Sequence, residues 1–145
     1  MRVLIQRVNT SQVIVEGKTI ADINHGLLIL LGIAPGDDEV KSAAMAKKIA
    51  QLRIFEDEQG KMNLSVLDTG GAAIVVSQFT LFADTRKGNR PSFVGAASPD
   101  VASPLVDHFA GELRKFNIPT QAGEFGAHML VNLQNDGPVT IFLEM

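Results

Sequence analysis

Alternating apolar and polar positions open the chain and predict a strand over residues 2–8. In this strand Val3, Ile5 and Arg7 share one face, so an arginine lies beside core-forming side chains. Residues 27–33 are continuously apolar, a pattern typical of a strand that is buried on both faces. Period-two runs bounded by turn residues predict further strands over residues 11–16, 18–23, 52–56, 62–67, 72–82, 129–134 and 139–144.

Two stretches instead have the three- and four-residue apolar spacing of helices. The first follows Asp37-Asp38, which offer an N-cap and an acidic first turn, and runs to about Leu52. The second opens at Ser98-Pro99-Asp100 and runs to about Phe116. Many strands with two principal helices predict an α+β fold of mainly antiparallel sheets on which the helices pack. The 145 residues suit one domain, 1–145, with a real hydrophobic core.

Composition narrows the class of protein. With 46% hydrophobic and 20% charged residues, the chain is expected to be globular and cytoplasmic, because no leader pattern or membrane-length apolar run is present. The absence of cysteine excludes disulfides, thiolate metal sites and cysteine nucleophiles. A net charge of −3 argues against broad nucleic-acid binding, and we expect no DNA partner and no membrane. The sequence has one basic loop, with Arg86, Lys87 and Arg90. Runs of charge like this one usually form solvated loops.

The common catalytic patterns are missing. His25 is expected in a turn, His108 on the solvated side of its helix, and His128 near the start of a strand. No nucleophile elbow, zinc-ligand spacing or glycine-rich phosphate loop occurs. We therefore expect neither a metal nor a cofactor.

A polar group of residues ends the predicted central strand, in Ser77-Gln78-Phe79-Thr80-Leu81. In a straight strand Gln78 and Thr80 would face one way, and Ser77 and Phe79 the other. Polar groups at this position need partners or water. Strand-end hydrogen bonding and the lining of a pocket both remain open interpretations of this pattern.

A second unusual segment, Asn135-Asp136-Gly137-Pro138-Val139-Thr140, places a Gly-Pro step between the last two predicted strands. A plain turn is the simpler interpretation. Since a bond before proline favours the trans form by only about 0.5–1 kcal/mol, a fold can also hold it cis. A cis step could aim two backbone carbonyls outward as a rigid surface.

In these two segments the chain resembles the bacterial D-aminoacyl-tRNA deacylase family. Further segments carry the resemblance along the whole chain, namely Arg53-Ile54-Phe55, Gly60-Lys61-Met62-Asn63 and Arg90-Pro91-Ser92-Phe93. The resemblance implies a partly open, barrel-like sheet arrangement and an intimate homodimer. It implies hydrolysis of the ester between a D-amino acid and the 3′-terminal adenosine of tRNA, and removal of glycine mischarged on tRNA-Ala, without a cofactor.

The resemblance also assigns roles to residues. Gly137 and Pro138 would form a cis chiral filter that reaches into the partner's pocket, and Arg7 would brace it. Phe125 and Met129 would contact the terminal adenine. The remaining assignments are catalytic positions at Ser77, Gln78, Phe79 and Thr80, and phosphate contacts at Arg86, Lys87 and Arg90.

Two mechanisms and two other functions remain open. In one mechanism the 2′-hydroxyl of the terminal adenosine helps to activate water while the protein supplies orientation and oxyanion stabilisation. In the other, Thr80 is a nucleophile, although no base for it is visible in the sequence. The chain could instead be a non-catalytic binding module for the tRNA end, or a conventional esterase that uses a histidine. The preferred D-amino acid is not determined by the sequence.

Overall fold

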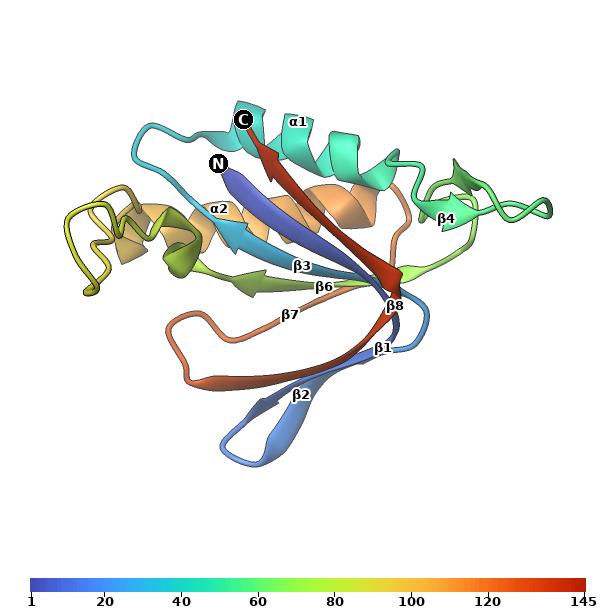
Figure 1. The fold of residues 1–145 in the computed structure, drawn as a ribbon, viewed down its shortest axis with the longest axis horizontal. Helices are drawn as coiled ribbons and strands as arrows, with labels where there is room; N and C mark the ends of the chain where they lie inside the picture. The colour runs from blue at the N-terminus through green and yellow to red at the C-terminus, as the bar shows by residue number, and fades with distance from the viewer.

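The computed structural model describes all residues 1–145. In this structure two principal helices lie against one side of a strongly curved sheet (Figure 1). Its elements are, in chain order, β1 (Arg2–Val15), β2 (Lys18–Ile23), β3 (Gly26–Gly32), α1 (Glu39–Ala50), β4 (Phe55–Glu56), β5 (Met62–Leu64), β6 (Ala72–Ser77), the 3₁₀ helix η1 (Phe79–Phe82), α2 (Pro99–Lys115), β7 (Thr120–Ala122) and β8 (Met129–Glu144).

The main sheet has six strands and mixed pairing. Its order is β2-β1-β3-β6-β7, with β8 also paired to β1. Strand β1 is antiparallel to β2, β3 and β8, whereas β3, β6 and β7 are parallel neighbours. The parallel pairs follow from the helical crossovers between these strands, since parallel strands cannot be joined by a tight turn. The α+β class with two principal helices is confirmed, and the parallel strands are the part that the strand pattern did not predict.

Strand β1 explains why the sheet curls. Its first half pairs with β3 and its second half with β2, while β8 runs along its other edge over nearly the whole length. The predicted strands 2–8 and 11–16 are therefore one continuous strand, and so are 129–134 and 139–144. Register shifts near Val8 in the β1–β8 pairing bend both strands together.

Strand β3 separates two hydrophobic clusters. Leu27, Ile29 and Leu31 face the larger cluster, in which α1 and α2 pack on the sheet. Leu28 faces a smaller cluster, which the curled part of β1 and β2 closes from the other side. The expected burial of this strand on both faces is confirmed. The sheet thus has one face under the helices and one face under its own curled edge.

Helix boundaries agree closely with the sequence pattern. Helix α1 begins after Asp38, whose side chain accepts a hydrogen bond of 2.8 Å from the Lys41 N–H. Helix α2 begins at Pro99, where the missing N–H of proline costs nothing because the first N–H groups of a helix have no helical partner.

The predicted hairpin over 52–67 is reduced to the short strands β4 and β5, and β7 was not predicted. No helix is long and apolar enough to cross a membrane.

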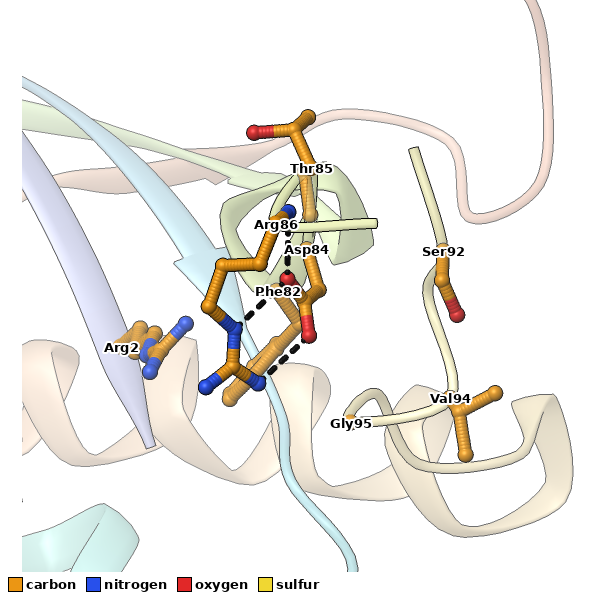
Figure 2. Close-up of a pocket in the computed structure, with 9 residues that line it drawn as sticks. Arg2, Phe82, Asp84, Thr85, Arg86, Ser92, Val94 and Gly95 are labelled. Carbon is orange, nitrogen blue, oxygen red and sulfur yellow. Dashed lines mark hydrogen bonds and ion pairs between the residues drawn. The ribbon is translucent and has the colours of Figure 1, made fainter. Parts of the chain in front are cut away.

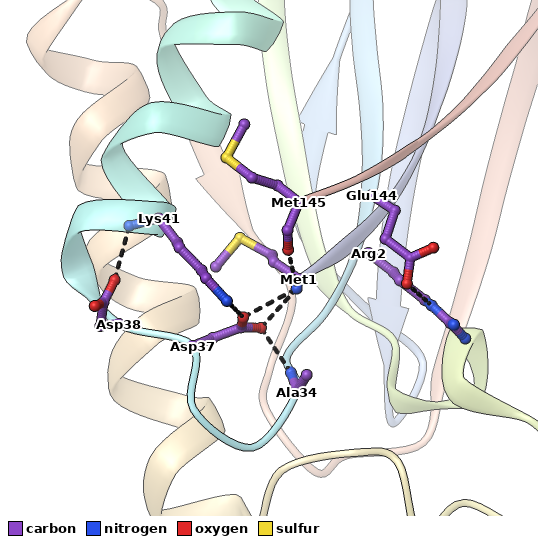
Figure 3. A network of polar contacts seen from close by, with 8 residues as sticks. All are labelled: Met1, Arg2, Ala34, Asp37, Asp38, Lys41, Glu144 and Met145. Atoms are coloured by element: carbon purple, nitrogen blue, oxygen red, sulfur yellow. Dashed lines mark hydrogen bonds and ion pairs between the residues drawn. The ribbon is translucent and has the colours of Figure 1, made fainter.

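The two chain ends meet beside α1 (Figure 3). The N-terminal ammonium of Met1 lies 2.9 Å from one carboxylate oxygen of Asp37 and 3.0 Å from the other, and it donates to the Met145 carbonyl at 2.7 Å. Burial by itself would raise the pKa of the Asp37 carboxyl. The hydrogen bonds that it accepts from the Ala34 N–H, the ammonium and Lys41 outweigh this effect, so the pKa lies below its usual value.

Candidate functional site

The central strand ends five residues earlier than the pattern predicted. Strand β6 stops at Ser77, and the Gln78 N–H still reaches the Leu31 carbonyl at 2.8 Å. The chain then turns into η1, in which the Leu81 N–H donates to the Gln78 carbonyl at 3.2 Å. Strand β3 ends at Gly32, so no ladder remains for residues 79–82 to continue. The predicted alternation of faces over 77–80 is therefore wrong.

Gly32 allows this turn to sit close to the sheet. A Cβ on Gly32 would lie 2.9 Å from Cε2 of Phe82 and 3.0 Å from the Gln78 carbonyl oxygen. Contacts this short are not tolerated without displacement of one partner. The absence of a side chain at Gly32 thus lets η1 pack directly over the end of β3.

A cavity of about 560 Å³ opens beside η1. Its lining is mostly apolar and includes Ser77, Phe79, Phe93, Phe125 and Met129. The rings of Phe79 and Phe93 meet edge to face, with centroids 5.0 Å apart. Three segments that are distant in the sequence thus form one pocket, with a polar strand end at its side. Phe93 was not singled out from the pattern as a lining residue, although it belongs to the recurrent Arg90–Phe93 segment.

The polar groups of this region are joined to each other. The Gln78 amide Nε2 donates a hydrogen bond to the Thr80 hydroxyl, and both Phe79 and Thr80 are exposed. No carboxylate or imidazole hydrogen bonds to Thr80. As the first residues of η1, Phe79 and Thr80 have no earlier helical carbonyl to accept from their N–H groups.

Gly137 and Pro138 lie elsewhere, at the bend of β8, and do not line this cavity. Their peptide bond is cis, and both residues are exposed. Asn135 spans the bend: its Oδ1 accepts from the Val139 N–H at 3.0 Å, and its Nδ2 donates to Thr140 Oγ1 at 2.8 Å. Within one chain the structure therefore brings Ser77, Phe79, Phe125 and Met129 together, but not the Gly-Pro step.

Arg7 anchors the chain beneath this bend. Its side chain is only 4% exposed, and Nη1 donates to the Ile54 carbonyl at 2.6 Å. Nε lies 2.9 Å from Asp136 Oδ2, and Nη2 lies 3.7 Å from Glu56 Oε1. The Nε contact is close, but its direction does not meet the geometry of a hydrogen bond, so we describe it as an ion pair. The predicted burial of Arg7 with core residues is confirmed.

The basic loop is less free than its sequence suggests. The Arg86 guanidinium forms a two-nitrogen fork on Asp84, at 2.9 Å from Nε and 2.6 Å from Nη2 (Figure 2). These hydrogen bonds hold the pKa of the Asp84 carboxyl well below its usual value. Lys87 and Arg90 are exposed and form no ion pair. Arg86 is therefore positioned, whereas Lys87 and Arg90 are free charges.

The histidines are not arranged for hydrolysis. His108 was expected to be solvated, but its Nδ1 lies 3.0 Å from the Ser42 hydroxyl and its Nε2 lies 3.4 Å from Glu112. This group resembles a serine–histidine–carboxylate triad only in composition, because Ser42 is 0% exposed between the two helices. His25 meets the ring of Phe55 edge to face, with ring centroids 5.0 Å apart. No three His, Asp or Glu side chains gather as a metal site.

Comparison with known proteins places this chain in a family. The family model described as D-Tyr-tRNA(Tyr) deacylase matches residues 4–144. A D-aminoacyl-tRNA deacylase of Thermomicrobium roseum is 58% identical over 144 residues, which cover 99% of this chain and 94% of the relative. The corresponding protein of Cereibacter sphaeroides (strain ATCC 17029 / ATH 2.4.9) is also 58% identical, with 99% of each chain covered.

Solved structures agree with this match. The structure described as c-Myc DNA Unwinding Element Binding Protein has a TM-score of 0.93 and 42% sequence identity, and it covers 100% of this chain and 99% of its own. A probable eukaryotic D-amino acid tRNA deacylase has a TM-score of 0.82 over 99% of this chain and 98% of its own, and at 16% identity it shows a shared fold alone. The full-length sequence matches show that this chain belongs to the D-Tyr-tRNA(Tyr) deacylase family.

Proposed function

We propose that this protein hydrolyses the ester bond of D-aminoacyl-tRNA in the cytoplasm and releases the free amino acid and tRNA. Membership of the family supplies the class of activity, a hydrolase acting on aminoacyl-tRNA. The observation that carries the proposal in this chain is the apolar cavity beside Ser77, Gln78 and Thr80. An exposed polar turn next to an aromatic pocket can hold a polar ester and an unstacked base at the same time.

The pocket suits the 3′-terminal adenosine. Phe125 is 37% exposed, Met129 is half-buried, and both line the cavity together with Phe79. Single-stranded RNA ends are recognised by stacking of bases on aromatic side chains, and a thioether is a favourable neighbour of a ring. We therefore propose that the adenine lies between Phe125 and Met129, so that the ester is directed towards Ser77 and η1.

The chirality check would come from a second copy of the chain. Gly137 and Pro138 are exposed and lie outside the cavity of their own chain, so a filter at this site requires the step of a partner subunit. In the proposed homodimer their carbonyl oxygens accept hydrogen bonds from the ammonium and the Cα–H of a D-amino acid. The same oxygens clash with the side chain of an L-amino acid. Because the filter works by a steric clash with any L side chain, its selectivity does not depend on which side chain the amino acid carries. Glycine lacks the rejected group, so glycine mischarged on tRNA-Ala would also be hydrolysed.

Catalysis would need only modest help from the protein, because the aminoacyl ester is already reactive. The N–H groups of Phe79 and Thr80 are proposed oxyanion donors, and Ser77 and Gln78 would hold the substrate. The Thr80 hydroxyl accepts from the Gln78 amide, and an amide is no base. This arrangement supports activation of water by the adenosine 2′-hydroxyl over attack by Thr80.

The direct test compares two charged tRNAs. We expect rapid release of the amino acid from D-aminoacyl-tRNA and from glycyl-tRNA, and none above background from the L-aminoacyl form. Tight binding of D-aminoacyl-tRNA without release would instead identify a binding module for the tRNA end. Simultaneous replacement of His25, His108 and His128 by asparagine should leave turnover intact, and its loss would favour a histidine esterase.

DNA binding is the competing activity suggested by a neighbour's description, and it belongs to that protein. Here the net charge of −3 gives little general attraction for phosphate. We propose that duplex DNA does not compete with D-aminoacyl-tRNA. Competition at equal nucleotide concentration measures this, and inhibition by DNA would show that a shared nucleic-acid surface exists.

A further inference from the structure

A second cavity, of about 640 Å³, adjoins the apolar pocket and is polar (Figure 2). Arg2, Phe82, Asp84 and Arg86 line it on the side of the sheet and η1. A strap formed by residues 92–96 completes it, through Ser92, Val94 and Gly95. Of the roles assigned above, only the phosphate contact of Arg86 falls in this cavity, and the cavity as a whole has no assigned ligand.

The strap is a common wall between the two cavities. Phe93 and Ala96 line the apolar pocket, whereas Ser92, Val94 and Gly95 line the polar one. Val94 is 88% exposed, so this part of the strap is accessible to solvent. A ligand longer than one nucleotide can therefore occupy the apolar pocket and continue over the strap into the polar cavity.

Two arginines in the polar cavity are held in place by their own neighbours. The Arg2 guanidinium lies 4.7 Å from the Phe82 ring centroid, donates to the Leu81 carbonyl at 3.0 Å, and pairs with Glu144 at 2.8 Å. The Arg86 side chain is 88% exposed, and its fork on Asp84 orients the guanidinium. Each arginine retains one terminal nitrogen, Nη2 of Arg2 and Nη1 of Arg86, that makes no hydrogen bond.

This arrangement fits a phosphodiester. Both local carboxylates, Asp84 and Glu144, are already paired with an arginine, so they repel an incoming anion less than free carboxylates would. A guanidinium that is already oriented loses little entropy when it binds a phosphate oxygen. The hydroxyl of Ser92 adds a neutral donor on the opposite side of the cavity.

We propose that this cavity binds the phosphodiester that joins the terminal adenosine of the RNA to the preceding nucleotide, together with the sugar of that nucleotide, with Arg2 and Arg86 as the phosphate ligands. This inference rests on the proposed function, because it requires adenosine in the adjoining pocket. It extends that function by one nucleotide and adds Arg2, which the sequence pattern had not marked. The recognition is of the backbone, so it does not depend on the base.

Binding of two small probes, adenosine and the dinucleotide CpA, tests the proposal by NMR titration. Wild-type protein should bind CpA about tenfold more tightly than adenosine, and this preference should weaken with added salt. Arg2→Gln and Arg86→Gln should each lose most of the preference while adenosine affinity is unchanged. The unchanged adenosine affinity also shows that each variant is folded. Arg2→Lys, which keeps the charge without the planar guanidinium, should retain part of the preference.

The matched control is Lys48→Gln, which removes one positive charge from the last turn of α1, an element that does not line the cavity. It should leave the CpA preference unchanged. Equal wild-type affinities for CpA and adenosine, or a preference that survives both arginine replacements, would overturn the inference. Failure of the proposed function is a separate result: wild-type protein would release no D-amino acid from tRNA, whatever its preference for CpA.

Discussion

The buried guanidinium of Arg7, on β1, lies 2.9 Å from the carboxylate of Asp136, on β8, directly beside the Gly-Pro step. The same side chain donates to the Ile54 carbonyl at 2.6 Å, so one residue ties the bend of β8 to the segment that leads into β4. A Cβ on Gly137 would lie 3.2 Å from Arg7 Nη2, which shows how closely the bend rests on the arginine. We therefore propose that Arg7 supports the proposed filter.

Replacement of Arg7 should weaken both stability and activity. Arg7→Ala would leave the buried Ile54 carbonyl without its donor and Asp136 without its counter-charge, and we expect a loss of about 3 kcal/mol in the free energy of unfolding. Urea denaturation measures this loss. Arg7→Lys should recover part of it, because a lysine supplies the charge but cannot reach three partners at once.

The control for Arg7 is Arg53→Ala, since Arg53 is an exposed arginine that also donates to a backbone carbonyl, that of Asn63. It should change stability little. If Arg7→Ala left both stability and the turnover of D-aminoacyl-tRNA near wild type, Arg7 would not support the bend.

Gly32 should tolerate no side chain, because η1 rests on it. Gly32→Ala would push Phe82 and the Gln78 carbonyl away, and we expect a loss of about 1–3 kcal/mol in stability together with reduced turnover. Gly111→Ala is the matched control, since its added Cβ meets nothing within 4 Å and alanine is favoured within a helix by about 1 kcal/mol. Thermal unfolding should therefore move in opposite directions for the two variants.

The Asp37 carboxylate should make stability depend on acidity. Because its folded-state pKa lies below the unfolded value of about 3.9, its contribution is fully present above pH 4 and is lost as the pH falls further. Asp37→Asn should destabilise the protein at pH 6 and flatten the decline in stability below pH 4. Urea unfolding over this range measures both effects. Asp107→Asn, on the exposed side of α2, should leave the decline unchanged.

The adenine site should depend on an aromatic ring at position 125. Loss of base stacking costs about 1–3 kcal/mol, so Phe125→Ala should raise KM for D-aminoacyl-tRNA about tenfold while kcat changes little. Phe125→Tyr keeps the ring and should behave like wild type. A lower kcat with unchanged KM would place Phe125 at the reacting ester instead of the base.

The two mechanisms predict opposite results for Thr80→Ala. If the 2′-hydroxyl assists, this variant should retain most of its activity, whereas loss of a nucleophile would cost on the order of a thousandfold or more. Substrate tRNA that ends in 2′-deoxyadenosine should then be hydrolysed about a hundredfold more slowly by the wild type. Undiminished turnover of this substrate would contradict assistance by the RNA.

Local patterns in the sequence determined most of the elements. The two helices, the doubly buried strand β3 and the burial of Arg7 follow from periodicity and capping, which depend on neighbours within a few residues. The two unusual segments around Ser77 and Gly137 were also recognisable, because polar or Gly-Pro residues interrupt otherwise apolar runs.

Tertiary structure decided where these segments end and which distant residues they contact. The end of β6 at Ser77 depends on where β3 stops, and the partnership of His108 with Ser42 depends on how α1 packs on α2. The pocket joins Phe79, Phe93 and Phe125, which no sequence spacing relates. Such contacts form between residues far apart in the chain, because each buried surface must find a partner that local preferences do not specify.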